Sequence, residues 1–350
     1  MKKLLVLLLI AALVGIVVSR NRGAERPASN TSAPSAAEAP SPAPAPPAVP
    51  GHGPDQGRLE PARRTLASAG PRETNVELPA LAAKQTAPPA PAQAAPKEGV
   101  QQTAQTPPDS PTAQQEKLLE QAHALLEAGD RVKAREILTG LYLNYRGRQA
   151  QDLRAVLDAI NKDLIFNPRC MEGAIIHTVS PGETLTKIGA QYHVNWRMVA
   201  LLNGMEPDDL LRAGRQLKVL AGAPSIVVWK GEFRLALLFD GAYVKEYPIG
   251  IGKDDSTPSG QFKVDEMMIR APWNPPGGGT IKYGEEGYAL GERWIAFDDQ
   301  PGAAGLGIHG TDHESSIGTK CSRGCIRMSN KDVIELYAFL KPGAKVRILE

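Results

Sequence analysis

The first third of the chain limits where a folded core can form. Residues 1–111 contain none of the chain's 18 Phe, Tyr and Trp residues, and the first aromatic side chain is Tyr142. The same stretch contains 19 of the 30 prolines, all between Pro27 and Pro111. Such a segment buries too little apolar surface to offset the conformational entropy lost on folding. We therefore expect packed domains only from about residue 112 onward.

Residues 21–111 are predicted to form a disordered, Pro/Ala-rich linker. Ala-Pro runs such as residues 41–47 favour extended polyproline conformation and donate few backbone hydrogen bonds. A linker of this kind lets a folded head sample a volume around the point where the chain is attached.

The amino terminus has the pattern of an export signal. Lys2 and Lys3 precede 15 apolar residues, Leu4–Val18. This length is at the upper limit of a signal-peptide core and just below the roughly 17–25 residues of a membrane span. We predict that residues 1–20 are a signal peptide or a signal anchor, which directs the chain to the periplasm or cell envelope. Whether residues 4–18 are removed or tether the chain to the cytoplasmic membrane stays open.

The formal charge argues against nucleic acid as a partner. The chain carries 40 Lys and Arg residues and 38 Asp and Glu residues, so its net charge is +2. Nucleic-acid binders concentrate a basic excess on one surface, and no basic cluster occurs in this sequence. Three cysteines are too few, and odd in number, for a disulfide scaffold. The sequence does not indicate an oligomeric state.

Residues 112–168 have the apolar periodicity of three amphipathic helices. Thr112, directly after Pro111, is the expected N-cap of the first helix. The first two runs resemble one tetratricopeptide-type hairpin. Because such repeats need about three copies to be stable alone, we predict a short helical spacer that packs on its neighbour.

Residues 175–220 have the pattern of a small α+β module. A β-rich run, two short helical runs and a second β-rich run follow one another, and Ser180 or the Pro181-Gly182 turn is the expected cap of the first helix. The order Pro-Gly-Glu-Thr-Leu, then Leu-Asn-Gly, closely resembles the lysin motif (LysM), whose fold is βααβ. The resemblance implies binding of N-acetylglucosamine-containing peptidoglycan glycan in a shallow groove. The residues that it places at this groove are Gly182, Glu183, Thr184, Leu185, Asn203 and Gly204.

The region from residue 225 to 350 is predicted to be mainly β. Short β-branched and aromatic runs alternate with turn dipeptides such as Lys230-Gly231 and Asp240-Gly241. This alternation indicates a β-sandwich or a partly closed barrel. One helix is expected at Lys331–Leu340, with Asn330 as its N-cap and Ile334 among its buried residues.

Two motifs in this region carry reactive side chains. Ile-His-Gly-Thr spans residues 308–311, and Ser-Arg-Gly-Cys-Ile-Arg-Met spans residues 322–328. A thiol is a strong nucleophile only as thiolate, so Cys325 needs a neighbouring base, and His309 can take its proton. The backbone N–H groups of Gly324 and Cys325 can stabilise an oxyanion. This set of groups suits acyl transfer from an amide.

These motifs, with Tyr-Pro-Ile-Gly-Ile-Gly at 247–252 and Thr-Pro-Ser-Gly-Gln-Phe at 257–262, resemble the L,D-transpeptidases (YkuD-type catalytic domain) over about 125 residues. The resemblance implies that Cys325 is the nucleophile, that His309 is the general base, and that the Gly310 carbonyl orients the imidazole. It implies a cofactor-free transferase that releases D-Ala from a peptidoglycan tetrapeptide stem. The acyl group of the third stem residue then passes to an amine, on a second stem (a 3→3 cross-link), a protein or an amino acid.

Four further residues are candidates for substrate contact. Ser322 can also hydrogen-bond the turn that holds the nucleophile. Arg327 can grip a carboxylate of the stem peptide or form a structural ion pair, and Tyr283 can line the cleft or pack in the core. Arg323 stands where many family members have His, which leaves the role of that side chain open.

Two alternatives remain. His309, His313, Cys321 and Cys325 have the order of a four-ligand zinc site, which would make the protein a zinc-dependent wall hydrolase. Against it, the Gly310–Asp312 stretch is a poor helix, and a zinc-bound Cys325 could not act as a free nucleophile, so we predict no metal. In the other alternative the thiol is idle, and the LysM module makes the protein a non-catalytic peptidoglycan anchor.

Overall fold

The computed structural model describes residues 112–206, 209–275, 277–301 and 303–350. The predicted signal segment, residues 1–20, and the predicted linker, residues 21–111, lie outside the described residues. Within the described part of the chain, no helix has the length and apolar character that a membrane crossing requires.

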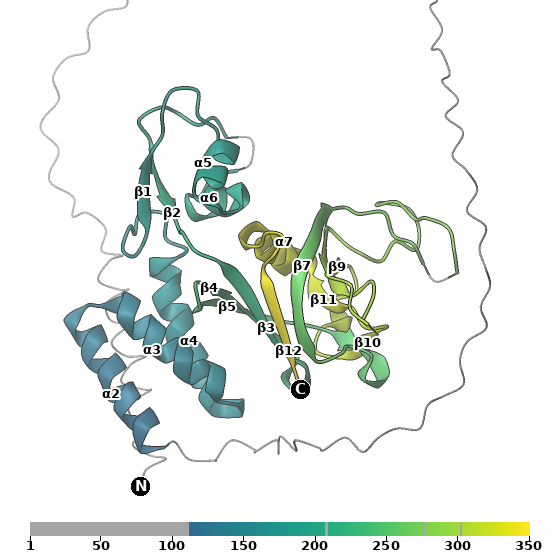
Figure 1. Ribbon diagram of the computed structural model, residues 1–350, viewed down its shortest axis with the longest axis horizontal. Coiled ribbons are helices and arrows are strands. Elements are labelled where there is room, and N and C mark those ends of the chain that lie inside the picture. The colour runs from purple at the N-terminus through teal and green to yellow at the C-terminus, as the bar shows by residue number, and fades with distance from the viewer. Residues whose placement is uncertain (1–111, 207–208, 276, 302) are drawn as a thin grey trace, which may run out of the picture. The chain divides into compact units, whose positions relative to one another are not determined.

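An eight-stranded mixed sheet forms the centre of the C-terminal region (Figure 1). In order across the sheet, its strands are β11 (Ile326–Ser329), β9 (Gly307–Thr311), β8 (Arg293–Phe297), β7 (Gly260–Ile269), β12 (Lys345–Leu349), β3 (Pro224–Trp229), β4 (Arg234–Phe239) and β5 (Ala242–Pro248). Neighbouring strands are antiparallel except for β11 with β9 and β12 with β3, which are parallel. The strand β4, next to the edge strand β5, is buried along its whole length.

Two short elements nearly close this sheet into a barrel. After β5, Gly250 exchanges two backbone hydrogen bonds with Arg327 of β11, at 2.9 and 2.8 Å. The next residues form β6 (Ile251–Gly252), which pairs in parallel with β10 (Lys320–Ser322). The chain that follows one edge strand therefore bonds to the opposite edge strand. The prediction of a mainly β, barrel-like domain is confirmed.

The two predicted hairpin turns differ. Asp240 and Gly241 connect β4 to β5 with positive φ angles of 51° and 79°, as a tight two-residue hairpin requires. The Lys230-Gly231 dipeptide lies instead in a short 3-10 turn, Lys230–Glu232, between β3 and β4. The dipeptide alone does not distinguish these two connections.

The helix near the C-terminus, α7 (Asn330–Phe339), packs against β8, β9 and β11. Its N-cap is Ser329, whose hydroxyl accepts a hydrogen bond from Asp332 N at 3.1 Å, so the prediction of Asn330 as the cap is wrong. Ile334 is 39% exposed because it lies on the side of the helix away from the buried residues, and its predicted burial is also wrong.

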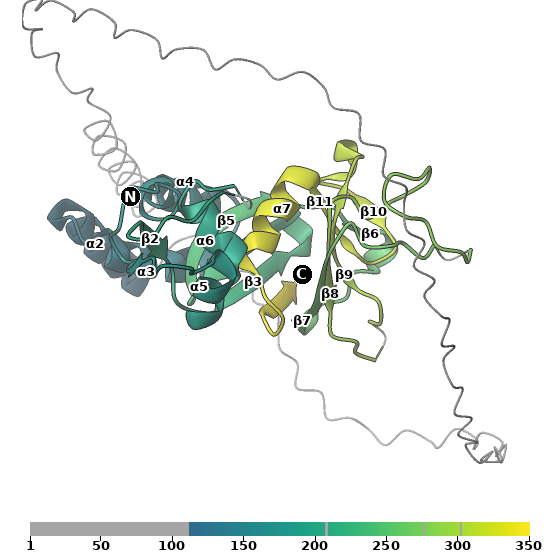
Figure 2. The ribbon, with the colours of Figure 1, turned by 90° about the horizontal axis from the view of Figure 1, so that it is seen from above.

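Three helices precede the two modules: α2 (Ala113–Ala128), α3 (Arg131–Asn144) and α4 (Gly147–Leu164). Thr112 caps α2, as predicted, since its hydroxyl accepts a hydrogen bond from Gln115 N at 3.3 Å. The helices α3 and α4 pack against β5 (Figure 2).

Polar side chains of α3 and α4 complete the hydrogen bonding of β5. Thr139 Oγ1 accepts from Tyr243 N at 3.0 Å. Asn161 Nδ2 donates to the carbonyls of Tyr243 and Val244, at 2.7 and 2.9 Å. Because the edge of a sheet presents unpaired N–H and C=O groups, these contacts cover the edge that β5 would otherwise expose.

The βααβ module consists of β1 (Ile175–Thr178), α5 (Leu185–Gln191), α6 (Trp196–Leu202) and β2 (Gln216–Val219). Its two strands are antiparallel, and it has a small hydrophobic core of its own. The cap of α5 is Thr184, whose hydroxyl accepts from Lys187 N at 3.3 Å. The prediction of Ser180 or the Pro181-Gly182 turn as the cap is therefore wrong. The observed cap lies two to four residues later in the chain.

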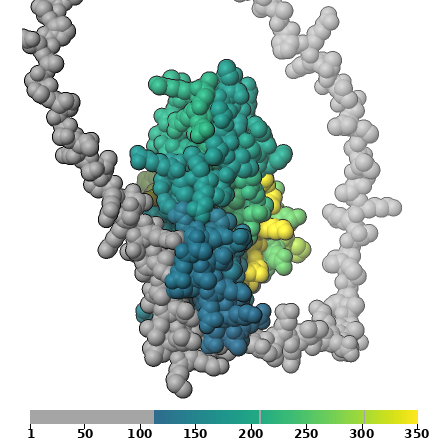
Figure 3. All heavy atoms as spheres, turned by 90° about the vertical axis from the view of Figure 1, so that its left-hand side faces the viewer, coloured from purple at the N-terminus to yellow at the C-terminus, as the bar shows by residue number. Residues whose placement is uncertain are grey.

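Lys218 of β2 joins this module to α4. Its side chain is fully buried and donates to the carbonyls of Leu164, Ile165 (3.0 Å) and Asn167 (3.1 Å). An ammonium group suits this position because the last carbonyls of a helix lack intrahelical partners and carry partial negative charge. In the space-filling view, the atoms of helices α2–α4 and those of the βααβ module form one continuous surface (Figure 3).

Candidate active site

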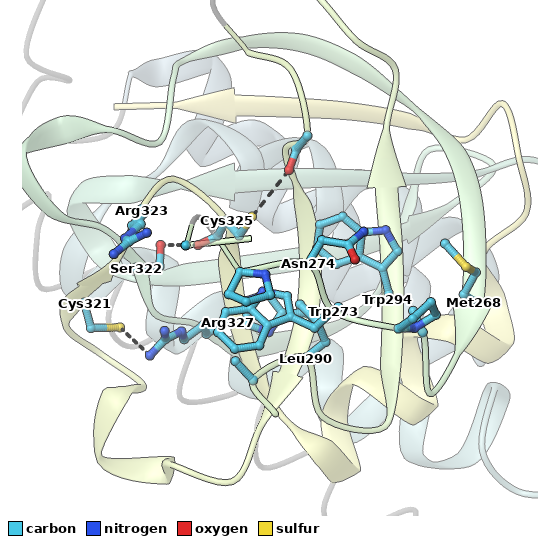
Figure 4. Close-up of a pocket in the computed structure, with 17 residues that line it drawn as sticks. Met268, Trp273, Asn274, Leu290, Trp294, Cys321, Ser322, Arg323, Cys325 and Arg327 are labelled. Atoms are coloured by element: carbon cyan, nitrogen blue, oxygen red, sulfur yellow. Dashed lines mark hydrogen bonds between the residues drawn. The ribbon is translucent and has the colours of Figure 1, made fainter. Parts of the chain in front are cut away.

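The strand register brings the reactive residues to one face of the sheet. Arg327 of β11 pairs with His309 of β9, His309 pairs with Trp294 of β8, and Trp294 pairs with Met268 of β7. Directly paired residues place their side chains on the same face. Cys325 precedes Arg327 by two residues and shares that face. All five line a cavity of about 1000 Å³ (Figure 4).

His309 is oriented by its own neighbour in the chain. The imidazole is buried, and its Nδ1 lies 2.7 Å from the carbonyl oxygen of Gly310. A carbonyl can only accept, so Nδ1 carries the proton and Nε2 remains a base. Burial, reinforced by the positive charge of Arg327, lowers the pKa of His309 to about 4. The imidazole is therefore neutral at neutral pH.

Cys325 is a protonated thiol in this state. Burial raises its pKa above the usual value, although the Gly307 backbone N–H and the charge of Arg327 act in the opposite direction. Its Sγ donates to the carbonyl of Gly305 at 3.7 Å. No hydrogen bond joins Cys325 to His309 among the described residues, so the two side chains must come within hydrogen-bond distance before the proton is transferred.

The Ser322 side chain holds the turn that presents the nucleophile. Its hydroxyl donates to Cys325 O at 2.6 Å and accepts from Gly324 N at 3.1 Å. The Gly324 N–H, expected as an oxyanion donor, is therefore engaged within the turn in this structure. The Cys325 N–H has no hydrogen-bond acceptor among the described residues and is the group left for an oxyanion. Ser322 is likewise engaged within the turn.

Thr257 fixes the nucleophile turn from a distant part of the sequence. It is fully buried, accepts a hydrogen bond from Gly252 N at 2.8 Å, and donates to Gly324 O at 2.7 Å. Gly324 has a φ of 137°, and a Cβ there would lie 3.0 Å from the carbonyl oxygen of Ser256. In the sequence, Thr257 is marked only as part of the Thr-Pro-Ser-Gly-Gln-Phe motif, which does not reveal this role.

The arginines of the second motif face the cavity without acidic partners. Nη1 of Arg327 lies 3.7 Å from Cys321 Sγ, and its Nε is buried without a partner. Arg323 lines the same cavity. Neither forms an ion pair with a described residue. The structural ion pair considered for Arg327 is therefore absent from the described part of the chain.

Tyr283 does not line this cavity. Its hydroxyl donates to Glu292 Oε1 at 2.5 Å, and Arg270 lies 4.4 Å from its ring centre. These contacts occupy the hydroxyl of Tyr283 and one face of its ring. Its contact with a substrate stays a prediction. Trp273, from the same loop, does line the cavity.

The four residues of the zinc alternative do not form a metal site. Among the described residues there is no group of three or more His, Cys, Asp or Glu side chains that could hold a metal ion. Cys321 contacts the carbonyl of Ser316 at 3.4 Å and the guanidinium of Arg327. The His309 Nδ1 contacts a carbonyl.

The residues expected at the glycan groove have mostly internal contacts. Asn203 is buried, and its Nδ2 donates to the carbonyls of Val199 (2.7 Å) and Lys218 (2.8 Å). Its Oδ1 accepts from Lys218 N at 2.8 Å. Its side chain therefore joins α6 to β2, and both N–H donors of its amide are used inside the module. Gly182 and Gly204 have positive φ angles of 73° and 59° and serve as turn residues.

The Glu183 carboxylate closes the turn before α5. Its Oε2 accepts from Ser180 N at 2.8 Å and lies 2.9 Å from Nε2 of His177. The hydrogen bond from the Ser180 N–H lowers the pKa of Glu183, and the contact with His177 lowers it further. Leu185 belongs to the module's core, and Thr184 caps the helix.

Comparison with known proteins agrees with both modules. The YkuD model, described as the L,D-transpeptidase catalytic domain, matches residues 223–348, and the LysM domain model matches residues 177–220. The Bacillus subtilis protein named L,D-transpeptidase YkuD is 34% identical over 185 residues, which are 50% of this chain and 98% of that protein. A second Bacillus subtilis relative, named L,D-transpeptidase YqjB, is 37% identical over 134 residues, 37% of this chain and 74% of that protein.

This chain belongs to the L,D-transpeptidase family. The Escherichia coli relative named L,D-transpeptidase YcfS is 31% identical over 191 residues, 48% of this chain and 59% of that protein. Among solved structures, the catalytic domain of the Enterococcus faecium L,D-transpeptidase is matched over 98% of its length and 37% of this chain, with a TM-score of 0.30 and 23% identity. The family assignment rests on the sequence relatives.

Proposed function

We propose that this protein is a peptidoglycan L,D-transpeptidase with Cys325 as its nucleophile. Cys325 attacks the carbonyl of the third residue of a tetrapeptide stem, D-Ala leaves, and the acyl group passes to an amine. The single observation that carries this proposal is the placement of Cys325 and the base His309 at neighbouring strands, facing one cavity. Family membership supports the same reaction.

The proton moves through His309 in both half-reactions. Nε2 takes the thiol proton as the S–C bond forms, and the Cys325 N–H donates to the resulting oxyanion. When the C–N bond breaks, the imidazolium returns the proton to the departing D-Ala amine, which leaves a thioester. An incoming amine then attacks the thioester, its proton passes through the imidazole to sulfur, and the free thiol is restored.

The low pKa of His309 favours the step of each half-reaction in which the protonated imidazole gives its proton away. An imidazole with a pKa of about 4 is a weak base, so it accepts the thiol proton only as the bond to carbon forms. Once protonated it is a strong acid and readily returns the proton to an amine. The same burial that makes the resting pair neutral therefore assists departure of D-Ala.

The LysM module supports a wall-bound setting. Glycan binding by residues 175–220 would raise the local concentration of stem peptides around the catalytic residues 225–350. We propose that residues 112–168 connect them to the linker, residues 21–111. Residues 1–20 would export the chain to the periplasm or cell envelope. The acceptor is an amine of a second stem, of a protein or of an amino acid.

The test is incubation of the soluble protein with defined tetrapeptide muropeptides, followed by mass spectrometry of the products. We expect release of D-Ala, transfer of the acyl group, and loss of both activities in Cys325→Ala. Intact-mass measurement with a carbapenem should add one covalent adduct to the wild type and none to Cys325→Ala. Retained D-Ala release in Cys325→Ala contradicts the mechanism. A wild type that binds glycan but forms no adduct indicates the non-catalytic anchor.

A further inference from the structure

A second cavity of the catalytic domain lies over the strands β7, β12 and β3, which are neighbours in the sheet (Figure 1). Its volume is about 440 Å³, and no described residue lines both this cavity and the one around Cys325. Three exposed cations line it: Lys263 of β7, and Lys345 and Arg347 of β12. We call this cavity the basic groove.

The strand register brings these three cations together. Lys345 pairs directly with Lys263 across the antiparallel strands β12 and β7. Arg347 follows Lys345 by two residues and so lies on the same face, about 7 Å further along the strand. Lys263 is far from the other two in the sequence, so the sequence shows no basic cluster here.

The three cations have no counterion of their own. None of them forms an ion pair or a side-chain hydrogen bond with a described residue. The one acidic residue among the described residues of the groove is Asp298, whose Oδ1 accepts from Lys263 N at 2.6 Å. Three cations and one carboxylate leave a net charge of +2. Like charges directly opposite in a sheet repel each other, and a bound anion would relieve this repulsion.

The lining of the groove indicates the kind of anion. A lysine ammonium is a compact charge that binds phosphate well. The one aromatic residue that lines the groove, Phe262, is 5% exposed, so nucleic-acid bases would find no surface on which to stack. Gln261 and Ser225 also line it, and their amide and hydroxyl can hydrogen-bond to hydroxyl groups of a ligand.

The row of cations suits a polymer whose charges lie in its main chain. In an extended polypeptide, carboxylate side chains point to alternate sides, so only every second one could face the groove. In a phosphodiester polymer each linkage carries a charge within the chain itself. Consecutive charges of such a polymer can therefore meet consecutive cations of the sheet.

We propose that the basic groove binds a polymer of polyol units joined by phosphodiesters. Its phosphates contact Lys263, Lys345 and Arg347, and its hydroxyl groups meet Gln261 and Ser225. This inference is independent of the proposed function, because the groove and the cavity around Cys325 have no described residue in common. A polymer bound there would hold the catalytic domain while the Cys325 cavity stays open.

The test measures binding of poly(glycerol phosphate) to the soluble protein by calorimetry at several salt concentrations. Three phosphate contacts predict that log K falls with log salt with a slope of roughly −2. In Lys263→Gln and in Lys345→Gln, we expect Kd to rise about threefold to fivefold and the slope to become shallower by about 0.7. Lys331→Gln removes an exposed cation of α7 outside the groove and is the matched control, with both values unchanged. Absence of binding, or wild-type values in Lys345→Gln, overturns the proposal.

Three other anions test the choice of ligand: polyglutamate, a single-stranded oligonucleotide, and vesicles that contain an anionic phospholipid. We expect each to bind more weakly than poly(glycerol phosphate) at the same ionic strength. Equal or tighter binding of any of them overturns the assignment, in favour of carboxylates, nucleic acid or a membrane surface.

The active site provides the last control. Cys325→Ala should bind the polymer like the wild type, and Lys345→Gln should release D-Ala from a short soluble peptide at the wild-type rate. Polymer binding that is lost in Cys325→Ala would place the polymer in the catalytic cavity and contradict the basic groove. Polymer binding without D-Ala release by the wild type would support the groove and contradict the proposed function.

Discussion

The LysM module and the catalytic cavity use their polar motif residues in opposite ways. In the module, Asn203 makes three internal hydrogen bonds, and Glu183 closes a turn. In the cavity, Arg323 has no ion-pair partner among the described residues, and the thiol of Cys325 donates only a long hydrogen bond, to the Gly305 carbonyl. Both sets of residues stand out equally in the sequence. Only the structure separates motif residues that build the fold from those that remain available for a ligand.

This difference has a physical basis. A module with a small core depends on buried polar groups to fix its turns, because its apolar area is small. The catalytic domain has a large sheet and core, and can leave groups such as Arg327 Nε without a partner.

Removal of the base should have the largest effect. His309→Asn keeps an amide N–H that can donate to Gly310 O but has no basic nitrogen. We expect D-Ala release to slow about a thousandfold, the usual contribution of general acid–base catalysis, with the melting temperature almost unchanged. If turnover in His309→Asn stays within about tenfold of the wild type, His309 is not the base.

Loss of the Thr257 hydroxyl should disturb the nucleophile without touching the substrate. Thr257→Val keeps the shape but leaves Gly252 N and Gly324 O without their partner. We expect kcat to fall about a hundredfold with little change in KM, because Thr257 positions the turn. Thr257→Ser restores a hydroxyl and should recover most of kcat. A pure KM effect, or no rescue by Ser, would contradict this role.

Asn203→Ala tests the module side of the contrast. Three internal hydrogen bonds are lost, so the free energy of unfolding of the module should fall by about 3 kcal/mol, measured by denaturant titration. Release of D-Ala from a short soluble peptide should change by less than about twofold, because the cavity is distant in the fold. A stable Asn203→Ala module with weakened glycan binding would instead make Asn203 a ligand contact.

The pH dependence should be the smallest effect. With the pKa of His309 lowered to about 4 and that of Cys325 raised, both groups are neutral across the physiological range. The rate of D-Ala release should therefore change less than about twofold between pH 7 and 5 and fall only as pH drops through about 4. An ordinary histidine would lose about twenty-five-fold over the same interval, and such a loss would contradict the buried, neutral imidazole.

Much of the fold follows from local sequence signals. The Asp240-Gly241 hairpin and the Thr112 cap were predictable because each depends on a few neighbouring residues. The N-cap of α7 was not, because Ser329 and Asn330 are both competent caps. The Asn330 side chain is used in tertiary contacts instead, accepting from Glu292 N at 2.9 Å and donating to an aspartate at 2.6 Å.

The residues of the candidate site were predictable only where a short sequence motif contains a reactive side chain. Cys325 and His309 follow from their residue types and from the family resemblance. Thr257 contacts Gly324, which is 67 positions away in the sequence. Sequence periodicity reports only neighbours within one helix or strand, so it cannot predict this contact. The engagement of the Gly324 N–H also depends on the conformation of a single turn. Tyr283 is 42% exposed in a loop, and the sequence alone does not show which way such a side chain faces.

The covering of β5 by Thr139 and Asn161 has a consequence for the molecule as a whole. The two helices take the place of a ninth strand at Tyr243 and Val244 and satisfy backbone groups there with which another chain could pair. A protein cut just before β3 would present a bare template for self-association. The helices therefore belong to the smallest unit that can fold soluble, and an enzyme trimmed to its catalytic motif would tend toward aggregates.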